Sequence, residues 1–168
     1  AHTWVIDDDS EDATSAIVSR WAAADSRVHL VQRRRPEART GKGDALNAAY
    51  HQLLQWLPED ADHDRIVVVV IDADGEMEPN ALEICSADDT FGDPAVGAAQ
   101  IAVWMKNRDD EKPYPNSGRF ANTLARFLLR MQDLEFRTTI AAMQSLRAKT
   151  GTVGLGGNGQ FTRLSVLD

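Results

Sequence analysis

Cysteine, basic residues and long apolar runs are all scarce in this sequence. The single cysteine, Cys85, excludes an internal disulfide and a zinc site built from cysteines, and it suits a reducing compartment. The 18 Lys and Arg residues against 26 Asp and Glu give a formal net charge of −8, which argues against a nucleic acid polymer or an anionic membrane as partner. No apolar run approaches the roughly 18 residues of a membrane span.

The composition that remains is that of a folded domain. With 168 residues, 43% of them hydrophobic, the chain can bury the core of one domain. The opening AHTWVIDDD resembles the last half of a strand, and the closing LSVLD resembles the start of a helix. We therefore expect one domain over residues 1–168 that is truncated at both ends.

Strand and helix segments alternate along the first half of the chain. Residues 66–71 are all Val or Ile, a pattern typical of a strand buried on both faces of a parallel sheet. Periodicity and turn residues predict strands at 3–6, 28–32, 66–71 and 96–105, and helices at 13–24, 44–57, 79–84 and 119–149. This order predicts an α/β architecture with a mainly parallel sheet, whose ligands bind beyond the carboxyl ends of the strands.

Two carboxylates directly follow the most apolar strand. Asp72 and Asp74 leave it one residue apart, where they repel each other unless a cation or hydrogen-bond donors compensate. A Mg²⁺ or Mn²⁺ ion shared with water and the phosphate oxygens of a substrate would do so. Because Asp-x-Asp is short and common, a simple turn before the helix at Pro79 is an equally supported interpretation.

A second acidic cluster, IDDDSED, follows the first strand. Ser10 and Asp12 are interpreted as caps of the next helix. Asp7 lies at the strand end, where it could accept hydrogen bonds from a nucleoside base or from ribose hydroxyls. In TGKGDALN, Lys42 could approach a diphosphate between two glycines, but the spacing of a phosphate-binding P-loop is absent, so a solvated lysine is favoured. Asp44 is interpreted as the cap of the second helix.

Two further features are interpreted as structural. For the four arginines of residues 33–39 a solvated charged loop is favoured over a phosphate patch. The apolar stripe of the helix at 119–149 shifts position at Ile140 and Met143, and it is interpreted as core. Contact with a partner or a membrane surface is the alternative, because Phe127, Leu128 and Leu129 stand in a row.

Five motifs, taken in order, resemble those of the family 2 glycosyltransferases, which have the GT-A fold. The segments are IDDDSED, GKGDALNAAY, VVVVIDADGEMEPNAL, VGAAQIAVWMKNR and VGLGGNGQFTRLSVL. They resemble the family's first acidic segment, a Gly-Lys helix start, the metal-binding DxD motif, a Val-Gly-x-x-Gln strand and a glycine-rich acceptor-side loop. The resemblance implies a Rossmann-like, mainly parallel sheet flanked by helices.

The resemblance also implies an enzyme, a glycosyltransferase of the hexosyltransferase type. It would transfer a sugar from a UDP- or GDP-sugar to a saccharide or lipid-linked acceptor, with inversion and with Mg²⁺ or Mn²⁺. Polysaccharide biosynthesis is the process implied. The domain would be cytoplasmic, at the inner face of the cell membrane where the parent protein is membrane-associated.

Individual residues receive roles from the same resemblance. Asp7 and Asp8 would hold the base and ribose, and Lys42 would lie beside the nucleotide. Asp72 and Asp74 would contact the ribose and the metal-bound diphosphate, and Asp74 is the one expected to bind the metal directly. The residues implied on the acceptor side are Gly156, Gly157, Gln160 and Phe161.

The sequence departs from the family pattern at two places. Asp9 replaces the glycine of the first motif, which affects the local turn more than the chemistry. The opening strand is absent, and the acidic residue that deprotonates the acceptor has no counterpart after Arg163. We therefore expect a donor site whose general base lies beyond residue 168.

Three other functions fit parts of the pattern. IDADG also resembles the nucleophile loop of haloacid dehalogenase phosphatases, in which Asp72 would attack phosphorus and Asp74 would protonate the leaving group. Glu76 and the mid-chain position of the loop argue against it. A pyrophosphorylase-like nucleotidyltransferase would need a basic glycine-rich loop after its first strand, and the loop here is acidic. A non-catalytic nucleotide-binding fragment is the third alternative.

Overall fold

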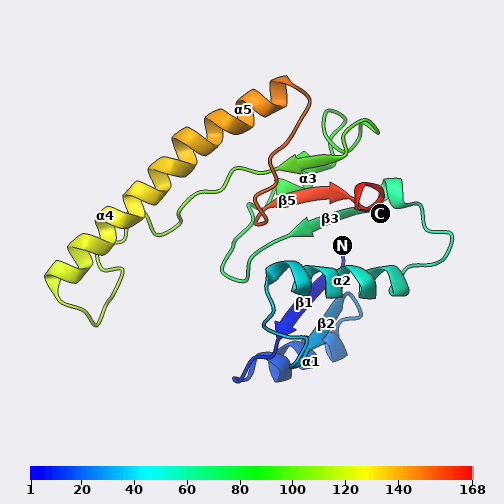
Figure 1. Ribbon diagram of the computed structural model, residues 1–168, viewed down its shortest axis with the longest axis horizontal. Coiled ribbons are helices and arrows are strands. Elements are labelled where there is room, and N and C mark those ends of the chain that lie inside the picture. Colours follow the sequence, from blue (N-terminus) through cyan, green and yellow to red (C-terminus); the bar gives the residue numbers. More distant parts are fainter. Residues whose placement is uncertain (168) are drawn as a thin grey trace. The chain divides into compact units, whose positions relative to one another are not determined.

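Two parallel strands, β1 (Thr3–Asp8) and β2 (Val28–Arg33), form the sheet of the first unit of the chain, Ala1–Ala61 (Figure 1). The structure is a computed structural model that describes residues 1–167, and a second unit begins at residue 62. Helix α1 (Thr14–Ala24) makes the crossover that a parallel pair requires. The predicted strands and their parallel pairing are confirmed in this unit.

Side chains before α1 bind backbone groups near the helix start. Oδ1 of Asp12 accepts the backbone N–H of Thr14 at 2.9 Å, which satisfies one of the free N–H groups at the helix start. The backbone of Ser10 instead donates to Asp7. Asp12 therefore supports the helix as predicted, and the prediction of a cap at Ser10 is wrong.

Helix α2 (Lys42–Trp56) is linked to the strands through an aromatic cluster. The ring of Trp4 stacks on His29 with centroids 4.2 Å apart, and the ring of Trp56 meets Trp4 edge-on at 5.9 Å. The N-cap is Gly41, whose φ of 131° favours glycine. Asp44 lies in the first turn, so the prediction that it caps the helix is wrong, because the chain enters the helix two residues earlier.

The second unit has a three-stranded sheet. Strands β3 (Val67–Val70), β5 (Gln160–Arg163) and β4 (Ala98–Gln100) lie in that order, with β5 antiparallel to both neighbours. Of the strand predicted over 96–105, only the three residues of β4 form a strand. Strand β5 falls in a segment that the sequence predicts as a loop, so that prediction is wrong for these residues. The α/β class is confirmed, with parallel pairing in the first unit and antiparallel pairing in the second. The prediction that residues 66–71 form a strand buried in a parallel sheet is wrong, because β3 is half-buried and antiparallel to β5.

Short elements and a buried arginine surround this sheet. They are η1 (His63–Arg65), α3 (Ala81–Cys85) and η3 (Leu164–Val166). Arg163, buried at the end of β5, donates to the carbonyls of Val96 at 2.8 Å, Phe91 at 2.9 Å and Asp93 at 2.8 Å. These peptide dipoles take the place of water around the buried charge and tie the surrounding loops to the sheet.

A long helical rod spans residues 119–149. It consists of α4 (Arg119–Glu135), a π-turn η2 (Phe136–Ile140) and α5 (Ala141–Lys149), which run on without a break (Figure 1). The predicted helix is confirmed, and the π-turn explains the shifted stripe because it adds one residue to a turn. Among the helices of residues 1–167, none has both the length and the apolar content to cross a membrane.

Candidate functional site

Asp7 is a buried carboxylate near the carboxyl end of β1. Its Oδ1 accepts the backbone N–H of Ser10 at 2.9 Å, and its Oδ2 accepts the hydroxyl of Ser15 and, at 3.3 Å, Nη1 of Arg34. Burial raises the pKa of Asp7, but the hydrogen bonds from Ser10, Ser15 and Arg34 outweigh it and hold this pKa well below its usual range. Asp7 is thus an ionised acceptor at the strand end.

The arginines of residues 33–39 pair with the acidic residues after β1. Arg33 is buried and contacts Asp8 Oδ1 at 2.6 Å, while the backbone N–H of Arg39 donates to Asp8 Oδ2 at 3.0 Å. Nε of Arg35 lies 3.0 Å from Asp9 Oδ2. The interpretation as a solvated charged loop holds for the exposed Arg34, Arg35 and Arg39, although they also pair with carboxylates, and it is wrong for the buried Arg33.

Asp9 adopts the backbone conformation that its family counterpart, a glycine, would adopt freely. Its φ is 66°, in the left-handed region that carries a cost for residues with a side chain. The carbonyl of Asp9 accepts Nη2 of Arg39 at 2.6 Å, and its carboxylate pairs with Arg35. These contacts offset the backbone strain, so the first turn is kept without glycine.

Lys42 is the first residue of α2, and its side chain is exposed. The start of a helix carries partial positive charge, and an ammonium group there adds to it. This placement suits an anion such as a diphosphate. The contact of Lys42 with a nucleotide stays a prediction.

Asp72 and Asp74 lie in a tight turn at the carboxyl end of β3. The N–H of Gly75 donates to the carbonyl of Asp72 at 2.8 Å, which closes the turn. Asp72 is half-buried and Asp74 is exposed. The interpretation of Asp-x-Asp as a simple turn and its interpretation as a metal site are therefore compatible, because the turn presents both carboxylates at one strand end.

Asn158 joins this turn to the glycine-rich loop of residues 151–159. Its Oδ1 accepts the backbone N–H of Asp72 at 3.2 Å, and the N–H of Gly159 donates to the carbonyl of Val70 at 2.8 Å. A Cβ built on Gly75 would lie 3.1 Å from Oδ1 of Asn158. The loop implied on the acceptor side thus lies directly beside the turn implied for the metal.

Gln100 at the end of β4 holds the same loop with both ends of its amide. Its Nε2 donates to the carbonyl of Asn158 at 2.8 Å, and its Oε1 accepts the N–H of Gly156 at 2.8 Å. Oε1 of Gln160 accepts the N–H of Gly157 at 3.1 Å. The backbone is therefore fixed while the exposed Gly156 offers no side chain, which leaves room for a sugar to approach.

Phe161 has its side chain in the core of the second unit. It is 1% exposed, and its ring centroid lies 6.4 Å from that of Phe91. It pairs with Val69 on one side and Ala99 on the other. The ring can therefore serve an acceptor site only by holding β5 and the loop before it in place.

The donor set can be tested against a divalent ion. In the part of the chain that the structure describes, no group of three or more His, Cys, Asp or Glu side chains is placed to hold a metal. Mg²⁺ and Mn²⁺ in phosphate chemistry need only one or two carboxylates, with water and phosphate oxygens completing the coordination. Asp72 and Asp74 therefore fit an ion that is bound jointly with a diphosphate.

The predicted residues fall into two groups. Asp7, Asp8 and Lys42 belong to the first unit, and the Asp72–Asp74 turn belongs to the second together with the glycine-rich loop. The structure brings together the residues of the second group.

Sequence reasoning missed three residues that hold the site. Gln100 and Asn158 stand inside the motifs VGAAQ and GGNGQF, so their positions carried a signal, whereas nothing distinguished Arg34 from its neighbours.

Known proteins resemble this chain over most of its length. The profile described as "Glycosyl transferase family 2" matches residues 2–149. Two proteins named "Beta-monoglucosyldiacylglycerol synthase", from Trichormus variabilis and Nostoc sp., are each 29% identical to the chain over 165 residues. The match covers 98% of this chain and 29% of each relative, so the chain spans less than a third of their length. No solved structure gives a significant match.

The family match covers most of the chain, including the first acidic cluster and the Asp72–Asp74 turn. It does not favour the phosphatase alternative, whose nucleophile loop shares only IDADG. The two acidic strand ends and the α/β fold are consistent with a GT-A domain. The chain belongs to glycosyl transferase family 2.

Proposed function

We propose that this chain forms the donor-binding part of an enzyme that transfers a sugar from a nucleotide diphosphate sugar to a lipid hydroxyl. Membership of the family supports glycosyl transfer. The lipid acceptor is supported by two relatives whose names describe the synthesis of a glucosyl diacylglycerol. A saccharide acceptor in polysaccharide biosynthesis is the alternative. A lipid acceptor also favours the inner face of the cell membrane as the location of the enzyme.

The observation that carries this proposal is the contact between the Asp72–Asp74 turn and the glycine-rich loop. Asn158 links them through the backbone N–H of Asp72. A diphosphate held at the turn would therefore lie next to an acceptor in the loop. Asp72 and Asp74 would hold Mg²⁺ or Mn²⁺, which when bound supplies Lewis-acid stabilisation to the departing diphosphate.

The first unit supplies groups that suit a nucleoside and its phosphates. Uracil and guanine each offer a ring N–H that an ionised carboxylate such as Asp7 can accept. The Asp7 side chain is buried and bound by Ser10, Ser15 and Arg34, so it would reach the base only in exchange for one of these bonds. Both oxygens of Asp8 are engaged by residues 33 and 39, so Asp8 shapes the loop around the base. Lys42 would place a positive charge near the phosphates of a nucleotide that this unit binds.

Inversion is proposed as a single displacement at the anomeric carbon. The acceptor oxygen forms a bond to this carbon as the bond to the diphosphate breaks on the opposite face. The hydroxyl proton passes to a general base. That base is proposed to lie beyond residue 168, in the part of the relatives' length that this chain does not span.

Calorimetric titration with UDP and GDP, with and without Mn²⁺, tests the proposal on the whole chain. Binding of one nucleotide should require the metal. Asp74→Asn removes a carboxylate charge without changing side-chain size, and it should weaken metal-dependent binding at least about tenfold.

A matched variant separates the turn from general acidity. Asp89→Asn makes the same change at an exposed carboxylate elsewhere in the second unit, and it should bind nucleotide as the wild type does. Equal binding by Asp74→Asn and the wild type would reject the metal site. Absence of nucleotide binding by the folded wild type would reject the donor site as a whole.

A further inference from the structure

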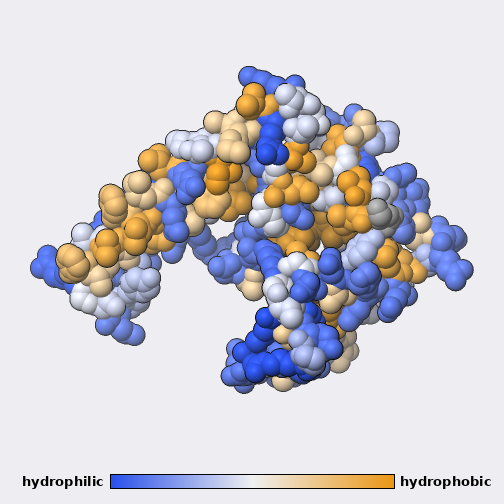
Figure 2. Space-filling model, viewed as in Figure 1, coloured by the Kyte–Doolittle hydropathy of each residue, from blue (hydrophilic) through white to orange (hydrophobic). Residues whose placement is uncertain are grey.

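A stripe of large apolar side chains along α4 is exposed. It consists of Phe120, Leu124, Phe127, Leu128, Met131 and Leu134. Each is at least 50% exposed, and Phe120 is 84% exposed. Apart from the adjacent Phe127 and Leu128 they recur every three or four residues, so they share one face, and Figure 2 shows hydrophobic side chains along this helix. The interpretation of the stripe as core is wrong for the described residues 1–167.

The opposite side of α4 is attached to its own unit. The buried side chain of Asn122 accepts the N–H of Tyr114 at 2.9 Å and donates to the carbonyl of Tyr114 at 3.0 Å. The buried carboxylate of Asp133 accepts the N–H of Met105 at 3.3 Å and lies 2.8 Å from Nη1 of Arg108. These contacts fix the rotation of the helix and hold the apolar stripe away from residues 105–118.

Arginines flank the stripe on one side. Arg119, Arg126, Arg130 and Arg137 follow one another at spacings of seven, four and seven residues, which places them along one side of the helix. A shallow hollow of about 330 Å³ is lined by Arg108, Arg130, Arg137 and Asp133 together with Phe127, Met131 and Leu134. Guanidinium groups therefore border large apolar side chains.

Trp104 lies beside this flank. The guanidinium of Arg137 sits 4.3 Å from the centre of its ring, and the side chain of Trp104 is half-exposed. Tryptophan and arginine together are typical of the boundary between water and a lipid bilayer, where one end of a side chain is apolar and the other is wet. The flank therefore has the chemistry of a membrane interface.

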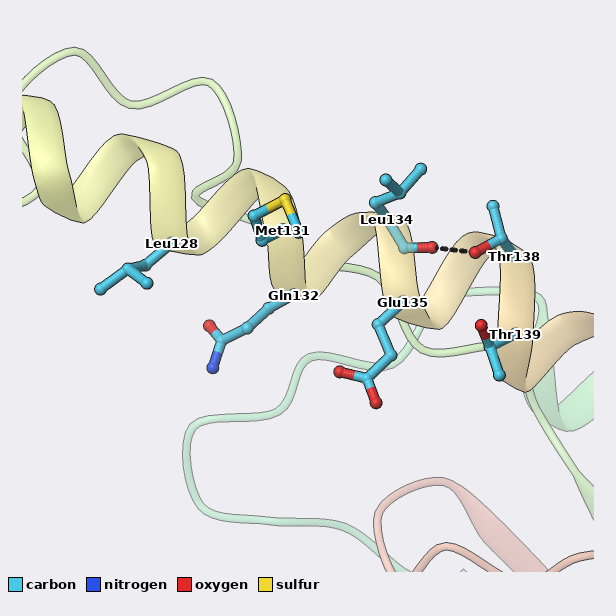
Figure 3. A pocket seen from close by; sticks show the side chains of 7 residues that line it. All are labelled: Leu128, Met131, Gln132, Leu134, Glu135, Thr138 and Thr139. Carbon is cyan, nitrogen blue, oxygen red and sulfur yellow. Dashed lines mark hydrogen bonds between the residues drawn. The ribbon is translucent and has the colours of Figure 1, made fainter.

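A polar edge bounds the stripe on its other side. Figure 3 shows Gln132, Glu135 and Thr139 following one another along one side of the helix, with Leu134 and Thr138 on another. They line a shallow hollow of about 560 Å³ with Leu128 and Met131. The apolar stripe is thus bounded on both sides by polar groups, as in helices that lie in the plane of a bilayer surface.

The charge of the long helix differs in sign from that of the chain. Residues 119–149 contain six Lys or Arg and two Asp or Glu, against a net charge of −8 for the whole chain. The net charge of the whole chain therefore does not exclude contact between this helix and an anionic membrane. A second copy docked helix to helix would bring these basic side chains together, at an electrostatic cost. An anionic lipid surface offers apolar chains to the stripe and negative headgroups to the arginines.

We propose that α4 lies in the surface of an anionic lipid membrane. The apolar stripe enters the boundary of the acyl chains, and the arginine flank contacts lipid phosphates, for which guanidinium groups are well suited. The proposal stands on the exposure and charge of the second unit, independently of the donor site. It would bring a lipid acceptor close to the domain.

Binding of the 168-residue chain to vesicles tests this proposal. The chain should sediment with mixed phosphatidylglycerol and phosphatidylcholine vesicles more strongly than with phosphatidylcholine alone, and less strongly at high salt. The double change Phe127→Glu and Met131→Glu should weaken binding more than about tenfold, because two apolar side chains no longer enter the membrane. The pair Arg126→Gln and Arg130→Gln should weaken binding to the anionic vesicles only, by roughly fivefold for each arginine.

Trp21→Glu is the matched control. It makes one change of the same kind, apolar to Glu, at a 65% exposed aromatic residue on α1, and its vesicle binding should equal that of the wild type. Near-UV circular dichroism checks that each variant is folded. Light scattering measures self-association of the same samples. A wild type that self-associates and does not bind vesicles, together with a stripe variant that no longer self-associates, would overturn the proposal in favour of a second copy.

Two further outcomes would overturn the proposal that α4 binds a membrane surface. One is a wild type that does not bind anionic vesicles, and the other is a stripe variant that binds as the wild type does. Calorimetry with UDP and Mn²⁺ on the same samples keeps the two proposals apart. Nucleotide binding without vesicle binding rejects the membrane surface and leaves the donor site standing.

Discussion

The two acidic clusters of this chain follow strand ends in the same way but are held by different forces. In the first unit the carboxylates meet guanidinium groups, as Asp7 does with Arg34 and Asp8 with the buried Arg33. Ion pairs of this kind fix a loop only as long as both charges are present. The shape of the first cluster therefore depends on its arginines.

In the second unit, backbone and amide groups shape the turn. The N–H of Gly75 closes it on the carbonyl of Asp72, and the amide of Asn158 accepts the N–H of Asp72. None of these bonds uses a carboxylate oxygen, so these bonds do not depend on an ion pair. The comparison teaches that one sequence pattern, acidic residues after a strand, can be stabilised in two unrelated ways.

The largest expected effect comes from removing the buried arginine of the first cluster. The Arg33 side chain is 8% exposed, and besides Asp8 it contacts the carbonyl of Glu37 and, at 3.1 Å, the hydroxyl of Thr40. Arg33→Met leaves these acceptors without their donor, so the free energy of unfolding should fall by about 2–3 kcal/mol. Urea unfolding measures the change.

Arg35→Met is the control for this prediction. The Arg35 side chain is 59% exposed and pairs with Asp9 at the surface, so its loss should cost less than about 1 kcal/mol. Equal losses in the two variants would show that burial of Arg33 adds nothing to the pairing, and the account of the first cluster would then be wrong.

A substitution in the glycine-rich loop should destabilise the structure that supports the Asp72–Asp74 turn. Gly159 has φ of 72°, and a Cβ there would lie 2.6 Å from Cγ1 of Ile101. Gly159→Ala should therefore lower the free energy of unfolding by about 2 kcal/mol, from backbone strain and overpacking together. Thermal or urea unfolding of the variant measures it.

Gly43 provides the comparison for that variant. It lies in the first turn of α2, and nothing approaches a Cβ there within 4 Å. Gly43→Ala should leave the chain as stable as the wild type or stabilise it by up to about 1 kcal/mol. A Gly159→Ala protein of wild-type stability would mean that the glycine-rich loop can relax without cost.

Elements set by local sequence were predictable, and elements set by distant pairing were not. The helix at 119–149 has a periodicity that needs no partner, and even the shift at its π-turn was visible in the stripe. Strand β5 has four residues after a glycine-rich loop, and its identity comes from pairing with β3 and β4, which lie far earlier in the chain. Short segments of this kind carry little signal of their own.

The candidate site shows the same division. Acidic residues directly after apolar strands could be assigned to strand ends, because the carboxyl end of a strand is where α/β proteins bind ligands. Their partners could not be assigned, since the choice of Arg34 for Asp7 depends on how two loops meet in space. The apolar stripe of α4 was taken for core because periodicity shows that a face is apolar and not what covers it.

The last expected effect is a change in the pH dependence of stability when Asp7 is replaced. Burial opposes its ionisation, but the bonds from Ser10 and Ser15 outweigh this and lower its folded-state pKa. The unfolded chain therefore takes up this proton first. The stability from Asp7 is present above its unfolded pKa of about 4 and is lost as the pH falls below it.

Urea unfolding of the wild type and Asp7→Asn at a series of pH values tests this. The wild type should lose stability as the pH falls from about 5 toward 2, and the variant should show a slope smaller by up to about one proton. Ser15→Ala, which keeps the carboxylate and removes one donor, should give an intermediate slope because the lowering of the pKa is only partly lost. Identical slopes in the wild type and Asp7→Asn would show that the hydrogen bonds around Asp7 do not lower its pKa, and the first cluster would then differ from the second only in its arginines.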